Sequence, residues 1–280
     1  MPWLRPLTLP LVALAALACS DAAESQGDLL LVTTTSVRDS GLLGALLPRF
    51  EQQTGIRTQV IAVGSGAALR MGSDANADVL ITHAPDGEAE LVASGAVADR
   101  VPFMENYFAI VGPPDDPAGV RSAGSPADAM RRIADTRSRY VSRGDDSGTH
   151  RRERALLEQA GLEPARGWPG FASTGSGMGQ TLAVAGERRA YALSDLGTYL
   201  AFRERIELEV LSRPDPALRN VYSVLRVDPS RLDPARAARA ERLEAFLVDD
   251  STQEWIGSFG RERFGQALFE PLHPARRAPP

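Results

Sequence analysis

The chain has 280 residues, with 31 Lys and Arg against 36 Asp and Glu, which gives a formal net charge of −5. This mildly acidic balance argues against a nucleic-acid-binding surface, so no nucleic-acid partner is expected. Every one of the basic residues is arginine, because the sequence contains no lysine. The composition therefore excludes a Walker-type phosphate loop, a lysine Schiff base and a lysine general base.

Residues 1–18 have the features of an export signal peptide. Arg5 supplies the positive start, an apolar run follows, and the small residues Ala16 and Ala18 predict cleavage just before Cys19. Cys19 is the only cysteine, so no intrachain disulfide can form. We expect the protein to be exported to the periplasm, either free or, as the alternative, with a lipid anchor at Cys19.

Short apolar strands alternate with amphipathic helices along the rest of the chain, a pattern typical of α/β folds with parallel sheets. In the helix expected at 42–53, the leucines and Phe50 recur at helical spacing, and Gly55 ends the helix. In chain order, the strands are expected at 29–32, 58–63, 77–82, 106–112, 139–142, 190–193, 208–211 and 221–227. The further helices are expected at 88–94, 126–133, 149–160, 178–187, 235–248 and 251–259. A short helix, capped by Ser194 and Asp195, is expected to run through Ala201.

The order of these elements predicts two α/β lobes with a cleft between them. Residues 27–110 plus 222–272 form the first predicted lobe, residues 111–221 form the second, and 273–280 form a frayed tail. Two strands, near Ile110 and near Ser223, then cross between the lobes. Such a pair of crossover strands permits hinge closure on a ligand, and we expect a monomer.

Four stretches share a design in which a strand end leads through small hydroxyl or glycine residues into a helix. They lie at 33–36, 64–66, 140–153 and 173–179. Backbone N–H groups at a helix start attract anions, and glycine lets the backbone approach a ligand closely. One such turn is also an ordinary helix cap, but four in one chain indicate a shared anion site.

Arg143 stands out in the third of these stretches, because it follows a strand directly and precedes Gly144. A guanidinium at this place can supply a fork of donors and the main positive charge for a dianion. The alternative is a surface arginine paired with Asp145 or Asp146. Ser147 and Thr149 open the next helix, and their hydroxyls can either cap that helix or face the cleft.

Other interpretations of the same residues are weaker. Ser147 and His150 are three residues apart and can form a hydrolase pair, but the chain lacks the G-x-S-x-G motif. Arg143-Gly144-Asp145 also matches a common adhesion tripeptide. His83 ends a strand and can face the cleft, yet three scattered histidines give no metal-binding spacing.

Seven motifs together carry a family resemblance. They are VTTTS at 32–36, VGSGAAL at 63–69, ADVLITHAP at 77–85, NYFAIVGP at 106–113, VSRGDDSGTHRRE at 141–153, TGSGMGQTL at 174–182 and YALSDLGTYL at 191–200. With these motifs the sequence resembles the periplasmic tungstate-binding proteins of ABC-type importers. The resemblance covers most of the chain after the signal peptide. The departures are a poor lipobox and the lack of lysine, and neither touches the motifs of the site.

The resemblance implies a periplasmic-binding-protein fold that closes on tungstate and delivers it to the permease subunit of an ABC transporter, without catalysis or a cofactor. Tungsten is then bound only as the oxyanion, with no metal site. Molybdate or another tetrahedral oxyanion is the alternative ligand, and a cleft hydrolase is the alternative from another class. By resemblance, the oxyanion ligands are Thr34, Thr35, Ser36, Ser65, Arg143, Ser147 and Thr149, while Ser176 either contacts the ligand or only forms the turn.

Overall fold

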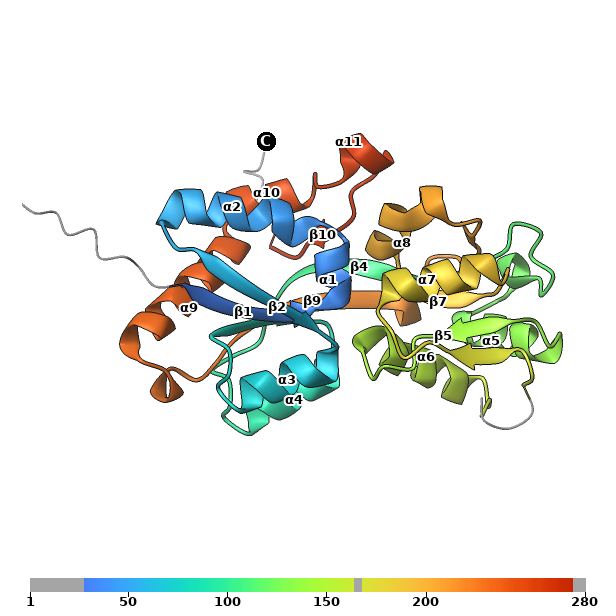
Figure 1. The fold of residues 1–280 in the computed structure, drawn as a ribbon, viewed down its shortest axis with the longest axis horizontal. Helices are drawn as coiled ribbons and strands as arrows, with labels where there is room; N and C mark the ends of the chain where they lie inside the picture. The colour runs from blue at the N-terminus through green and yellow to red at the C-terminus, as the bar shows by residue number, and fades with distance from the viewer. Residues whose placement is uncertain (1–27, 164–167, 274–280) are drawn as a thin grey trace, which may run out of the picture.

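The computed structural model describes residues 28–163 and 168–273 and consists of two α/β lobes joined by long strands (Figure 1). This architecture confirms the predicted fold class. The strands are β1 (Leu29–Thr34), β2 (Thr58–Val63), β3 (Val79–Thr82), β4 (Val101–Gly112), β5 (Tyr140–Ser142), β6 (Phe171–Ser173), β7 (Ala192–Asp195), β8 (Glu209–Val210), β9 (Arg219–Arg226) and β10 (Glu270–Pro271).

Most of the longer helices fall at the places that the amphipathic pattern indicates. They are α1 (Thr35–Asp39), α2 (Leu42–Thr54), α3 (Ser65–Ser73), α4 (Pro85–Ala93), α5 (Pro126–Asp135), α6 (Gly148–Gln159), α7 (Met178–Glu187), α8 (Leu196–Phe202), α9 (Pro234–Val248), α10 (Asp250–Ile256) and α11 (Arg261–Phe264). Four short 3-10 turns lie at Val120–Ser122, Arg203–Arg205, Pro216–Leu218 and Pro229–Arg231. Among the helices so described, none is long and apolar enough to span a bilayer.

The sheet of the first lobe has the strand order β10-β4-β9-β3-β1-β2. Strand β1 runs parallel to β2 and β3, whereas β9 runs antiparallel to β3 and β4. Side chains alternate between the two faces of this sheet: Val79 and Ile81 belong to one core cluster, and Leu80 between them belongs to another. This two-residue period identifies β3 as a strand buried on both faces.

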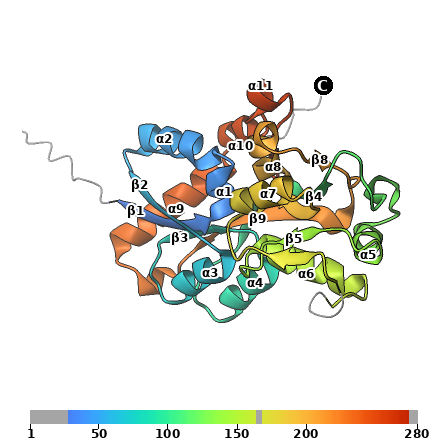
Figure 2. The same cartoon turned by 45° about the vertical axis from the view of Figure 1, so that its right-hand side comes forward.

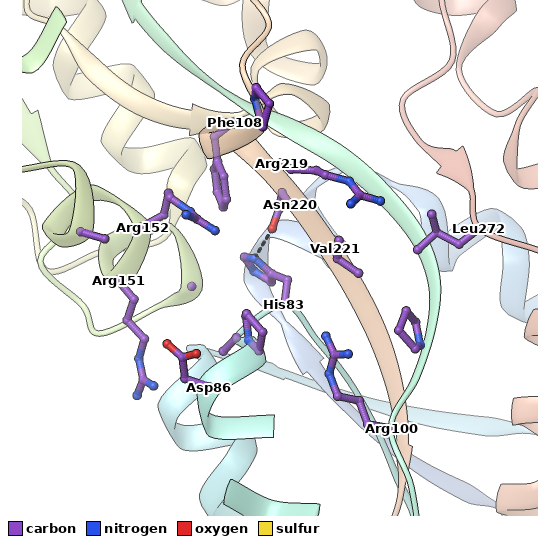
Figure 3. Close-up of a pocket in the computed structure, with 16 residues that line it drawn as sticks. His83, Asp86, Arg100, Phe108, Arg151, Arg152, Arg219, Asn220, Val221 and Leu272 are labelled. Carbon is purple, nitrogen blue, oxygen red and sulfur yellow. Dashed lines mark hydrogen bonds between the residues drawn. The ribbon is translucent and has the colours of Figure 1, made fainter. Parts of the chain in front are cut away.

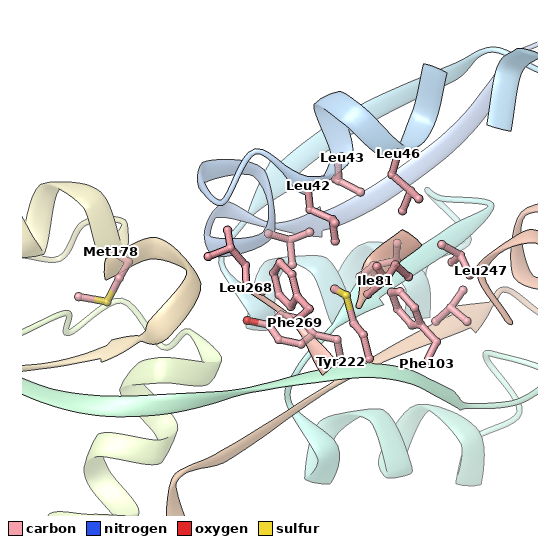
Figure 4. Packing of buried hydrophobic residues seen from close by; sticks show 14 of the residues in the cluster. Leu42, Leu43, Leu46, Ile81, Phe103, Met178, Tyr222, Leu247, Leu268 and Phe269 are labelled. Carbon is pink, nitrogen blue, oxygen red and sulfur yellow. The ribbon is translucent and has the colours of Figure 1, made fainter. Parts of the chain in front are cut away.

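Helices cover both faces of this sheet (Figure 1 and Figure 2). On one face, Leu42, Leu43 and Leu46 of α2 pack over Ile81 and the neighbouring strands (Figure 4). On the other face, the core is formed with residues from α3 and α4. The parallel strands therefore point their carboxyl ends toward the second lobe, with the starts of α1 and α3 at that edge.

Strand β4 passes from one lobe to the other. Its first part pairs with β9 from Val101 to Tyr107, and its last part pairs with β7 and β8 from Phe108 to Gly112. The second lobe adds the parallel pair β5–β6 and a core cluster of its own around Ile110 and Tyr140. The placement of the lobe boundary at residues 110 and 222 remains a prediction, because β4 pairs within both lobes.

Several element predictions need correction. The strand expected at 106–112 begins at Val101, and the helix expected at 251–259 ends at Ile256. Ser194 does not cap α8, because the Asp195 carboxylate accepts the N–H of Thr198 at 2.8 Å. No range was predicted for α1, α3, α11, β6 and β10. Apart from the nine-residue α3, these elements have at most five residues and are too short to show a periodic pattern.

Candidate functional site

The four hydroxyl- and glycine-rich turns meet between the lobes, at the starts of α1, α3, α6 and α7. The backbone N–H of Gly148 on α6 donates to the Ser65 hydroxyl on α3 at 3.0 Å. The Arg143 guanidinium donates to Thr35 Oγ1 on α1 at 3.3 Å. A Cβ atom placed on Gly177, just before α7, would lie 3.5 Å from the same Thr35 oxygen. The structure thus brings together the stretches that the sequence indicated as a shared site.

Arg143 is buried at this meeting point, with only 1% of its surface exposed. Its guanidinium forms an ion pair with Asp145, and its Nε atom is buried without a hydrogen-bond partner among the residues that the structure describes. Asp145 also accepts the backbone N–H of Ser147 at 3.2 Å. Asp145 is therefore the residue that orients Arg143. The alternative interpretation is right about the pairing with Asp145 and wrong about the location, because the arginine is buried.

Gly144 lets the chain turn between Arg143 and Asp145. Its φ angle is +62°, and a Cβ atom there would lie 1.7 Å from Ser173 Oγ. The left-handed backbone conformation and the lack of room for a Cβ atom beside Ser173 both require glycine at this position. The turn therefore directs the Arg143 side chain into the site while Ser173 packs behind the turn.

In the first turn of α6, the hydroxyls of Ser147 and Thr149 have different roles, which the sequence left open. Ser147 is the N-cap, and its hydroxyl accepts the N–H of His150 at 3.2 Å. Thr149 is fully buried, and its Oγ1 atom has no hydrogen-bond partner in the described parts of the chain. Because buried hydroxyls are nearly always paired, Thr149 is the hydroxyl that has bonding capacity left for a ligand.

On α1, the hydroxyls of Thr34 and Ser36 bond to each other at 3.1 Å. Ser36 also bonds to Nε2 of His83 at 3.2 Å, and Nδ1 of His83 lies 2.9 Å from Oδ1 of Asn220. Burial, reinforced by the nearby Arg143 cation, lowers the pKa of His83 to about 4. His83 is therefore neutral at pH 7.

Sequence reasoning did not find two polar neighbours of the site. Asn220 lies on β9, 137 residues from its partner His83, and only the pairing of strands brings them together. Glu153 lies on α6 one turn after Thr149, and burial raises its pKa to about 7. Both Glu153 carboxylate oxygens are buried, and neither has a partner in the described part of the chain that satisfies hydrogen-bond geometry.

The two weaker interpretations do not fit this geometry. The His150 imidazole accepts the N–H of Asp146 through Nδ1 at 3.0 Å, and the Ser147 hydroxyl is used by the helix cap. No hydrogen bond joins the Ser147 hydroxyl to the His150 ring in residues 28–163 and 168–273. The Arg-Gly-Asp tripeptide is not an adhesion loop either, because Arg143 is buried.

A cavity of about 600 Å³ lies beside the hydroxyl cluster, on the side of α4 and α6 (Figure 3). His83 and Gly148 form part of its wall, so they separate it from the hydroxyl cluster. Of the seven predicted ligand residues, none lines this cavity. Its charged walls are formed by Asp86, Arg100, Arg151, Arg152 and Arg219.

A resident metal would need a different set of side chains. Within the ranges that the structure describes, no group of three His, Cys, Asp or Glu side chains is placed to hold a metal ion. The site instead combines one buried guanidinium with hydroxyls and the N–H groups of helix starts. Such donors suit an oxygen-rich anion.

Two lobes joined by crossing strands, with helix starts converging on a buried arginine between them, define a solute-binding protein of the periplasmic type. A family model, described as the PBP superfamily domain, matches residues 20–248. The chain belongs to this superfamily and, within it, to the family of the tungstate-binding proteins.

Individual relatives support this placement. The chain is 39% identical over 254 residues to the tungstate-binding protein TupA of Peptoclostridium acidaminophilum, covering 90% of this chain and 88% of the relative. The solved structure of the tungstate ABC transporter from Geobacter sulfurreducens is similar, with a TM-score of 0.76, 38% identity, and 83% and 98% of the two chains covered. The solved structure of the tungstate-binding protein TupA from Desulfovibrio alaskensis G20 is also similar, with a TM-score of 0.74 and 37% identity. The match covers 88% of this chain and 98% of that chain.

Proposed function

We propose that this protein binds tungstate between its two lobes and delivers it to the permease of an ABC transporter. The observation that carries the proposal is the buried Arg143, whose guanidinium donates to Thr35 at the start of α1 in the facing lobe. A second bond between the lobes, from the Gly148 N–H to the Ser65 hydroxyl, joins the starts of α6 and α3. The relatives named as tungstate-binding support the choice of ligand. Molybdate, a tetrahedral dianion of nearly the same size, is the alternative ligand.

The chemistry of the site suits a fully ionised oxyanion. Tungstate has four oxygens that only accept hydrogen bonds at neutral pH, and the site offers N–H and O–H donors with one buried cation. A charge-assisted hydrogen bond contributes about 1.5 to 3 kcal/mol and a neutral one about 1 kcal/mol. Several such bonds suffice for nanomolar affinity, about −12 kcal/mol, after the costs of desolvation and closure.

The proposed ligand set keeps the seven residues named from the sequence, with unequal roles. Arg143 and Thr149 have bonding capacity left over, because the guanidinium Nε and the threonine hydroxyl have no partner within the described ranges. Ser65 and Ser147 accept backbone N–H groups and keep their own protons for the anion. Thr34, Thr35 and Ser36 supply the hydroxyls of the facing helix α1.

We further propose that the protein acts in the periplasm without catalysis or a cofactor. The signal peptide and the Cys19 anchor lie outside the described residues, so both remain predictions from the sequence. Ser147 and His150 lack the mutual hydrogen bond that a nucleophile and its base need. An oxyanion receptor therefore accounts for the site better than a hydrolase does.

Isothermal titration calorimetry of the mature protein with tungstate, molybdate, sulfate and phosphate tests this function. We expect submicromolar binding of tungstate and much weaker binding of phosphate, which retains a proton near pH 7 and needs an acceptor in the site. If none of the four anions binds below micromolar concentration, the receptor function is wrong. Tighter binding of molybdate than of tungstate would reassign the ligand and leave the site in place.

A further inference from the structure

A chain of buried hydrogen bonds leads from the site to both crossing strands. Ser36 bonds to His83, and His83 bonds to Asn220 on β9. The Asn220 amide then bonds to Asn106 on β4 and to Tyr222 on β9, both at 2.8 Å. All five residues are buried, so these bonds do not exchange freely with water.

The direction of the protons in this chain follows from the amide of Asn220. Its Nδ2 atom donates to Asn106 and Tyr222, so its Oδ1 atom accepts, and Nδ1 of His83 must carry the proton. In a neutral imidazole, Nε2 is then an acceptor, and the Ser36 hydroxyl donates to it. Ser36 has only one proton, so it has only lone pairs for other partners.

This direction conflicts with the binding of a fully ionised anion. The oxygens of such an anion are acceptors, so a Ser36 oxygen that offers only lone pairs repels them. If His83 carries a second proton on Nε2, that N–H donates to Ser36, and the Ser36 hydroxyl is free to donate to the anion. The charge of His83 therefore decides whether Ser36 acts as an acceptor or as a donor.

We propose that His83 is a specificity-determining residue, which takes up one proton from solvent when a fully ionised oxyanion binds and so turns Ser36 into a donor. This inference rests on the proposed function and adds that the protein takes up one proton, at His83, together with the ligand. The proton enters at Nε2, no other bond is broken, and the bound complex gains one positive charge opposite the dianion. The uptake favours ionised oxyanions over hydrogen phosphate, whose own proton needs an acceptor.

The surroundings of His83 support the uptake. Burial and the Arg143 cation keep His83 neutral in the unliganded protein, and Asp145 and the bond to Asn220 oppose them. A dianion beside Arg143 offsets that cation and raises the pKa of His83. The Arg-lined cavity borders His83 and gives solvent protons a route to the ring (Figure 3). The charged groups around the ring are Arg143 and Asp145 from the turn before α6, Asp86 from α4, Arg151 and Arg152 from α6, Arg100 before β4, and Arg219 from β9.

Calorimetry with tungstate in buffers of different ionisation enthalpy measures the number of protons taken up. We expect close to one proton per tungstate near pH 6, and an affinity that falls up to about tenfold per pH unit as the pH rises toward the pKa of the bound state. In His83→Gln, the uptake should disappear and the affinity should become independent of pH. Glu153→Gln is the matched control, because Glu153 is a buried group whose pKa is about 7, so it can also exchange a proton near neutral pH.

The controls keep this proposal apart from a purely structural role of His83. Imidazole ¹⁵N spectra of the wild-type protein should show both His83 nitrogens protonated with tungstate and only one without it. Because this measurement uses the wild-type protein, it tests the proposal even if His83→Gln does not fold. Tungstate binding without proton uptake would overturn the His83 proposal and leave the receptor function intact. Uptake that is lost in Glu153→Gln and kept in His83→Gln would assign the proton to Glu153 and also overturn it. Failure to bind tungstate at all would refute the receptor function and, with it, this inference.

Discussion

Replacing Arg143 with alanine removes the buried guanidinium at the centre of the site. The side chain is 1% exposed, and its Nε has no hydrogen-bond partner among the described residues, so an anion there can accept at least one new charge-assisted bond. Two such bonds contribute about 3 to 6 kcal/mol together. Since about 1.4 kcal/mol corresponds to a factor of ten, we expect Arg143→Ala to weaken tungstate binding at least about a hundredfold.

The same substitution also affects folding, because Asp145 loses its ion-pair partner. An unpaired carboxylate in a largely buried position destabilises a protein by about 3 to 5 kcal/mol. The double variant Arg143→Ala/Asp145→Asn removes this charge, so we expect it to recover much of the thermal stability but not the affinity. Comparing the single and double variants thus separates anion binding from folding.

Calorimetric titration with tungstate measures the affinity, and thermal unfolding measures the stability. Arg151→Ala is the matched control on the same segment, since Arg151 forms an exposed pair with Asp146 at 3.0 Å. Arg151→Ala should change the affinity little. An affinity of Arg143→Ala equal to that of the wild type would refute the assignment of the site, because no other arginine of residues 28–163 and 168–273 is buried at the meeting point of the four turns.

Three further variants test the surroundings of Arg143. Gly144→Ala should destabilise the protein by about 2 kcal/mol or more in urea unfolding, because φ is +62° and the new Cβ would meet Ser173; unchanged stability would mean that the turn relaxes freely. Thr149→Val keeps the shape but removes the unpaired hydroxyl, so tungstate binding should weaken about tenfold while the melting temperature holds or rises; equal affinity would show that Thr149 does not contact the anion. Burial raises the pKa of Glu153 from 4.5 to about 7, so the folded protein binds more protons than the unfolded chain and loses about 3 kcal/mol of stability as the pH rises from 4.5 to 7. In Glu153→Gln, denaturation midpoints should lose most of this pH dependence, and a dependence equal to that of the wild type would place the titration elsewhere.

Much of the fold can be predicted from the sequence because its strands are buried on both faces and its helices are amphipathic. Strand β3 has consecutive apolar residues, and α2 repeats its leucines at helical spacing until Gly55 ends it. Elements of three to five residues, such as α1 and β6, leave no such period. The length of β4 was underestimated, since Pro102 and Glu105 interrupt the apolar run that marks its second half.

The parts of the site that depend on residues close together in the sequence could be predicted, and those that depend on contacts between distant residues could not. Arg143 was found because a strand end, a glycine and a helix start surround it within a few residues. Its ion pair with Asp145 was one of two options that the sequence left open, and the turn geometry decides between them. The bond of His83 to Asn220 depends on the pairing of β3 with β9, and no local pattern encodes that register.

Anomalous diffraction at the tungsten absorption edge, from crystals of the protein grown with tungstate, tests the central claim most directly. We predict one strong tungsten peak between the lobes, with its oxygens within hydrogen-bond distance of the Arg143 guanidinium and of hydroxyls on α1 and α6. A peak inside the Arg-lined cavity beyond His83, or no ordered tungsten at all, would contradict the account of the site.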